Sequence, residues 1–187
     1  MHNPETRPAT VAGPVAENDH AIRELADLLA VLPGKYYRQA FGAHRQHIIG
    51  KHVRHIIDHY LSFLGVVSLS SIAPLNYENR QREEDLEQDH HAARKRLLAV
   101  AGSLEQLART PASTRLPMAH LSDEERVVMD TTVGRELVFL ASHTIHHMAI
   151  IAMLAEQAGI SVPEDFGVHP STLRHQRRQE TTMARSA

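Results

Sequence analysis

The stretch from residue 131 to residue 159, TTVGRELVFLASHTIHHMAIIAMLAEQAG, constrains the fold more than any other part of the chain. Its inward positions recur at alternating spacings of four and three, the pattern of a helix that packs one face in a core. Asp130, Thr131 or Thr132 can cap the start of this helix, and Gly159 can end it. The sequence therefore predicts a long core helix, whose stripe consists of Val133, Leu137, Leu140, Thr144, His147, Ile151 and Leu154.

Two histidines of this helix have the spacing of metal ligands. His143 precedes His147 by four residues, so the two imidazoles lie about one turn apart on one face. Around the helix axis, His147 is displaced by about 40° from His143, whereas His146 is displaced by about 60° the other way. A single ion therefore selects His143 and His147 and leaves out His146. Thr, Ile and His separate the pair, so the HExxH motif with its glutamate base is absent.

Composition excludes several classes of protein. With 187 residues and 42% hydrophobic content, one domain with a real core is expected. A net charge of -2 gives no electrostatic footprint for nucleic acid. The absence of cysteine excludes a disulfide scaffold, a thiolate zinc site and a cysteine nucleophile. No signal-like segment and no run of about 18 apolar residues is present, so we expect a cytoplasmic protein without a membrane partner.

Histidine is unusually frequent and clustered. The chain has 15 histidines against four Phe, four Tyr and no Trp, and residues 44–59 and 143–147 hold eight of them. Residues 47–67 predict a second helix, in which His52, His55 and His59 share a stripe beside the apolar side. His52 and His59 lie nearer the apolar centre than His55, so periodicity alone favours either of those as an inward ligand. The apolar side itself consists of Ile49, Val53, Ile56, Ile57, Tyr60 and Leu64.

The remaining segments complete a helical architecture. Residues 1–17 are expected to be a disordered lead-in, and residues 18–32 a first helix that Pro33 and Gly34 end. Residues 77–107 predict one long helix, at whose charged start Tyr77, Arg80 and Glu87 could face a pocket mouth. Residues 110–130 suit a lid or a short hairpin. Residues 161–187 are expected to be a tail that packs partly on the bundle near Phe166 and has a mobile end.

Four amphipathic helices predict an all-α, up-and-down four-helix bundle over residues 18–160, with a long connection between helices three and four. Metal sites in such bundles are built from facing helices, and three histidines leave positions open for water or substrate. Glu136 lies on the ligand stripe two turns before His143. It can act as a base or hold a ligand in place, or it can simply be a polar residue near the helix start.

Two segments carry a resemblance to a known family. GKHVRHIIDHY on the second helix and SHTIHHMAII on the last resemble the DinB-like superfamily of metal-dependent proteins, over about residues 20–160. The resemblance implies that His55, His143 and His147 bind a divalent metal, and Ile49 and Ile56 match the family pattern around His55. His59 stays the alternative to His55.

The sequence also departs from the family pattern at two positions. His52 stands where the family usually has an aliphatic residue. The closing DFGVHPSTLR resembles the tail of a subgroup, in which a small residue is expected at the place of His169.

The resemblance also implies a class of reaction. Relatives include thiol transferases and a thiol-dependent isomerase, so we expect a metal-dependent enzyme of transferase or hydrolase type, with Glu136 or a histidine assisting proton transfer. Its cofactors would be zinc, nickel or iron, with a low-molecular-weight thiol as co-substrate, and its partners a small-molecule substrate and a second copy in a homodimer. The alternative is a non-catalytic metal-binding or stress-response protein with a structural site. A bundle used for protein association is the third reading.

Overall fold

The computed structural model describes residues 9–68, 73–78, 83–122 and 125–186, except for the side chains of residues 180 and 182–186. The protein is mostly helical and has two small antiparallel sheets. Its helices are α1 (Ala12–Val31), α2 (Gly34–Tyr37), α3 (Ile49–Val67), the 3-10 helix η1 (Glu84–Glu87), α4 (His90–Glu105), α5 (Val133–Gln157) and α6 (Pro170–Ser186). Its strands are β1 (Ala40–Phe41), β2 (His47–Ile48), β3 (Arg115–Ser122) and β4 (Glu125–Thr132).

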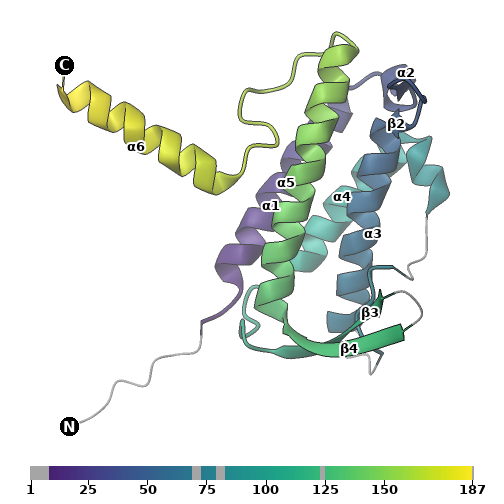
Figure 1. The fold of residues 1–187 in the computed structure, drawn as a ribbon, viewed down its shortest axis with the longest axis vertical. Helices are drawn as coiled ribbons and strands as arrows, with labels where there is room; N and C mark the ends of the chain where they lie inside the picture. The colour runs from purple at the N-terminus through teal and green to yellow at the C-terminus, as the bar shows by residue number, and fades with distance from the viewer. Residues whose placement is uncertain (1–8, 69–72, 79–82, 123–124, 187) are drawn as a thin grey trace.

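The long helices α1, α3, α4 and α5 lie side by side around one core (Figure 1). α1 packs against α4 and α5, and α3 packs against the same two helices. The apolar stripes predicted for these helices are buried, because each turns its stripe toward the shared interior. Fully buried large side chains in this core include Tyr37, Tyr60, Phe63, Ile22, Leu25, Leu29, Ile56, Ile57 and Leu97.

The helix directions differ from the expected up-and-down order. The start of α3 lies against the last residue of η1, because a side chain on Gly50 would meet the carbonyl oxygen of Glu87 at 2.3 Å. α3 and α4 therefore begin at the same end of the molecule, where only a glycine permits this approach. α1 and α5 begin together at the other end, where the side chain of Asn18 donates to the carbonyl oxygen of Leu137. The up-and-down prediction is wrong, since the chain returns along the molecule between α3 and α4.

The predicted helix over residues 77–107 is broken into η1 and α4. Asp89 is the reason, since its carboxylate accepts hydrogen bonds from the backbone of His91 and Ala92 at 2.9 and 3.0 Å and so caps a new helix. Leu86 and Ala93 are nevertheless both buried, so the apolar stripe continues across the break. Residues 79–82, including Arg80, lie outside the described part.

The connection after α4 is a β-hairpin, one of the two forms expected for it. β3 pairs with β4 from Arg115 opposite Thr132 to Ser122 opposite Glu125. Leu75 extends the sheet, since its N–H donates to Pro117 and its carbonyl accepts from Ala119, both at 2.8 Å. The hairpin crosses the end of the helices at which α5 begins (Figure 1). The all-α prediction therefore holds only roughly.

The first helix begins earlier than the sequence suggested. α1 starts at Ala12, and the N–H of Val11 donates to the carbonyl of Thr110 at 3.0 Å. Val15 is buried in the core, and Pro14 is tolerated because the first helical turn needs no intrahelical N–H donor. Residues 12–17 are therefore helical and not part of a disordered lead-in. Residues 1–8 of that expected lead-in lie outside the described residues.

Both predicted ends of the last core helix are confirmed. The Thr132 side chain accepts from the N–H of Arg135 at 3.2 Å, and Gly159 adopts a φ of 74° just after the helix. By length and composition, α5 is the one helix among the described residues that could cross a membrane. Its buried face, which includes Leu137 and Ile151, lies in the shared core.

The tail begins against α5 and then leaves it. Phe166 is buried, and Gly167 has a φ of 72° and lies directly against the backbone of Met148 and Ala149. α6 then projects away from the other helices (Figure 1). Nδ1 of His169 accepts from the N–H of Ser171 at 3.2 Å, at the start of this helix. Mobility of the chain end stays a prediction.

Candidate metal centre

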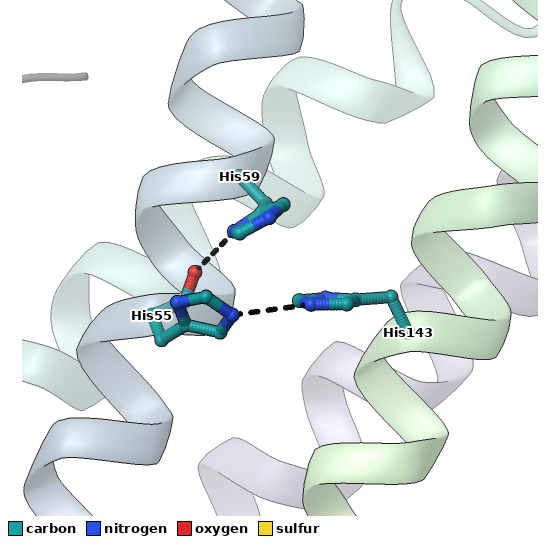
Figure 2. A group of neighbouring side chains, drawn as sticks. All are labelled: His55, His59 and His143. Carbon is teal, nitrogen blue, oxygen red and sulfur yellow. Dashed lines mark hydrogen bonds between the residues drawn. The ribbon is translucent and has the colours of Figure 1, made fainter. Parts of the chain in front are cut away.

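The candidate site lies where α3 and α5 face each other. The apolar side of α3 is anchored in the core by Val53, Ile57 and Tyr60, which turns its histidine stripe toward α5. As a result, Nε2 of His55 lies 3.2 Å from Nε2 of His143 (Figure 2). Two segments separated by almost half of the chain thus bring their imidazoles into direct contact.

His59 completes a compact group of nitrogens. Its Nδ1 lies 2.8 Å from the carbonyl oxygen of His55 (Figure 2). A carbonyl oxygen only accepts hydrogen bonds, so Nδ1 of His59 carries the proton and Nε2 carries the lone pair. The imidazole is buried, with 6% exposure, and stacks on His143 with ring centroids 4.2 Å apart. His59 is therefore held in the tautomer that a metal ligand needs.

The donor set fits a divalent metal ion. One ring nitrogen from each of His55, His59 and His143 can be chosen so that all lie within 4.8 Å of one another. Two nitrogens bound tetrahedrally to one zinc ion lie about 3.3 Å apart, as follows from Zn–N distances of about 2.0–2.1 Å. The 3.2 Å between His55 and His143 matches this separation. Imidazole nitrogens also suit zinc, nickel and iron.

His147 belongs to the same cluster. Its ring centroid lies 4.6 Å from those of His55 and His143, and its Nδ1 lies 3.0 Å from Nδ1 of His52. Burial, with the neighbouring imidazoles His143, His52 and His146, lowers the pKa of His147 to about 3. Burial also lowers the pKa of His52. His147 is thus neutral near pH 7, the form that binds metals.

The structure therefore brings two of the predicted ligands, His55 and His143, together with His59 into the group of nitrogens that could hold an ion. The third predicted ligand, His147, lies beside this group in ring contact but is not part of it. Which three of the four bind an ion stays a prediction. His146 is exposed, and its ring centroid lies 5.4 Å from that of His147. Helical periodicity alone favoured His52 or His59 over His55, because it carries no information on the approach of α5, which decides which of them face it.

Glu136 is fully buried and surrounded by donors. Its Oε1 accepts from Thr131 at 2.6 Å and from Arg135 at 2.8 Å, and its Oε2 accepts from the Tyr77 hydroxyl at 2.8 Å. The Tyr77 ring in turn stacks on His59, with centroids 5.1 Å apart and planes 17° apart. Burial and the Glu136 carboxylate raise the pKa of Tyr77 well above its usual range, so Tyr77 stays a neutral donor. Glu136 is therefore connected to the histidine cluster through the side chain of Tyr77.

Of the other residues that could face a pocket mouth, Glu87 accepts from Nε of Arg54 at 2.6 Å and ties η1 to α3.

Sequence patterns did not reveal the buried polar network beside the site. The Tyr60 hydroxyl donates to Asn18 at 2.6 Å and lies 2.9 Å from the Thr144 hydroxyl. This network ties α1, α3 and α5 together next to His143.

A mainly apolar, open pocket of about 620 Å³ lies on the surface of α5 and is lined by residues of α5 with Pro14, Ala112 and Thr132, and by none of the cluster histidines. Phe139 lines it, and the same ring is tilted against His143 and Tyr77, with centroids 5.6 and 5.4 Å away. Arg135 also lines the cavity, with its guanidinium over the Phe139 ring. A small molecule in this pocket would contact Phe139, which packs against His143.

The fold and site define a mostly helical protein with a histidine cluster that can hold a metal ion. The sequence model of the DinB family matches residues 12–178, and the chain belongs to this family. The family assignment made from the two histidine motifs is thus confirmed. The chain is also similar to "FK506-binding protein 5" of Rhizopus delemar, with 33% identity over 115 residues. That match covers 60% of this chain but only 30% of the relative's own length.

Proposed function

We propose that the protein is a metal-dependent enzyme of transferase or hydrolase type, which activates a thiol or water at the histidine cluster. The observation that carries this proposal is the approach of His55, His59 and His143, whose nitrogens lie within 4.8 Å. A bound divalent ion would supply Lewis-acid chemistry, lowering the pKa of a coordinated thiol or water toward neutrality. The four long helices would then form the family's four-helix bundle around this site.

The protein's own residues have distinct parts in this proposal. His55, His143 and His147 would hold the ion, and His59 is the alternative ligand to His55. Tyr77 holds His59 by stacking on it, and Glu136 holds Tyr77 by accepting a hydrogen bond from its hydroxyl. Three donors already occupy the Glu136 carboxylate, which favours this holding part over that of a general base. The cavity beside Phe139 would take the apolar portion of a small-molecule substrate.

The competing function is a non-catalytic protein whose metal site is structural. Cobalt substitution separates the two proposals, because a thiolate bound to Co²⁺ gives an intense near-ultraviolet absorption. Cobalt-loaded protein would be titrated with a small thiol such as dithiothreitol, with loaded His143→Ala protein as the control for nonspecific effects. A saturable absorption in the wild type alone supports an open site. An unchanged cobalt spectrum at high thiol supports a closed structural site, or one open to water only, and removes the thiol from the proposal.

Association as a homodimer stays a prediction. Light scattering at micromolar concentration tests it, and a monomer mass would remove it. The similarity to part of "FK506-binding protein 5" extends this proposal no further, since the match covers a minority of that protein.

A further inference from the structure

His52 is the histidine that neither the family pattern nor the proposed ligand set uses. It lies on α3 one turn before His55 and is half-buried. Its Nδ1 lies 3.0 Å from Nδ1 of His147, and the two rings are tilted by 42° with centroids 5.2 Å apart. This separation is that of a hydrogen bond between two ring nitrogens.

The short separation constrains where the protons lie. A neutral imidazole carries one N–H and one lone pair, so in this pair one Nδ1 must donate and the other must accept. If His147 binds a metal through Nε2, its lone pair is at Nε2 and its proton is at Nδ1. His147 is then the donor, and Nδ1 of His52 is the acceptor. With a metal ion on Nε2 of His147, the contact would therefore hold His147 in the tautomer that this coordination needs.

We infer that His52 is a positioning residue for the metal site: it accepts the Nδ1 proton of His147 and fixes the orientation of that ring toward the ion. This inference rests on the proposed metal function and on His147 being a ligand. Ligand histidines generally donate their second nitrogen to a carboxylate, a backbone carbonyl or water. His59 already follows this rule through the His55 carbonyl. At His147, the side chain of His52 would accept this hydrogen bond instead.

The test is a matched pair of substitutions at position 52. Asn places an acceptor oxygen where His52 has Nδ1, whereas Leu places an apolar methyl group there. Chelator competition would measure the Zn²⁺ affinity of each variant, and urea unfolding would measure the stability of the metal-free form. Removing such an orienting partner costs about 10–100-fold in metal affinity. We expect this loss for His52→Leu and an affinity within a few-fold of wild type for His52→Asn.

Controls separate this inference from the metal function and from a general effect on folding. His146→Leu changes an exposed histidine of the same region and should leave the affinity unchanged. Equal affinity in His52→Leu and wild type, with His147→Ala still weakening binding, overturns the inference alone. Unaltered binding in His147→Ala overturns the proposed ligand set. A loss of one of two bound ions in His52→Leu also overturns the inference, because His52 would then be a ligand itself.

Discussion

The Tyr77 hydroxyl donates to Glu136 at 2.8 Å while the Tyr77 ring stacks on His59, so a buried carboxylate is connected to the histidine cluster through one side chain. Tyr77 comes from the segment that returns along the molecule between α3 and α4. Tyr77 of this segment lies against the histidine cluster. The unexpected direction of α4 is therefore linked to the supply of one residue of the site.

Tyr77→Phe should destabilise the protein by about 1–3 kcal/mol, since hydrogen bonds to charged groups contribute about that much and Glu136 cannot reach water. Urea unfolding of the metal-free protein measures the change. Tyr36→Phe is the matched control, because the half-buried Tyr36 ring packs on Lys35 at the protein surface. Equal stability of the Tyr77 and Tyr36 variants would show that the buried contact contributes nothing.

Two glycines of α3 offer a sharper test of the fold. A Cβ at Gly50 would meet the Glu87 carbonyl oxygen at 2.3 Å, whereas a Cβ at Gly65 would meet nothing within 4 Å. Gly50→Ala should therefore cost at least about 1–3 kcal/mol through forced backbone shifts. Gly65→Ala should stabilise α3 by up to about 1 kcal/mol, through the better helix propensity of alanine. Thermal unfolding compares the two, and a harmless Gly50→Ala would contradict the close approach of α3 and η1.

Stability of the metal-free protein should fall as the pH drops below about 6.5. The pKa of His147 is lowered to about 3 in the folded protein, and that of His52 is lowered too, whereas in the unfolded chain both are near 6.5. The unfolded chain therefore binds more protons between these values, and folding is progressively opposed from about pH 6.5 toward pH 3. Melting temperatures between about pH 7.5 and pH 4 measure the slope. His147→Asn should flatten it, whereas the same change at the exposed His44 should not.

Much of the fold followed from local patterns, and the misses have identifiable causes. The ends of α5 were predictable because Thr132 and Gly159 are local signals. The break before α4 was missed because the apolar stripe runs through it, although Asp89 carried the signal of a cap. The direction of α4 depends on the contact between Gly50 and Glu87, which joins residues far apart in sequence. No periodicity reports such a contact.

The candidate site shows the same division between features that local patterns predict and features that depend on contacts between distant segments. His143 and His147 were predicted as ligands from their spacing on one helix, which is local information. Among His52, His55 and His59, periodicity favoured His52 or His59, and only the family resemblance selected His55, because the crossing of α5 determines what each of them contacts. His55 lies against His143, His59 stacks on His143, and His52 lies against His147. The partner of each α3 histidine on α5 is thus set by tertiary packing, which local sequence patterns do not contain.

The identity of the third ligand can be decided between His59 and His147. Replacing the true ligand by alanine should remove most bound metal and lower the melting temperature of the metal-loaded protein, since an ion that binds only the folded state stabilises it. Replacing the other should reduce affinity only modestly. Metal content and melting temperature should therefore change together in one variant. Full retention of metal in both variants would mean that a ligand outside this cluster completes the site.

Metal content of protein purified without an affinity tag tests the central claim most directly. Elemental analysis of the wild type should find about one divalent ion per chain, as a single three-histidine site requires. His55→Ala and His143→Ala should each lose most of it, whereas His146→Ala and His91→Ala should keep it. Wild-type protein that stays metal-free after incubation with zinc or nickel, or metal that survives His143→Ala but is lost in His146→Ala, would contradict the account.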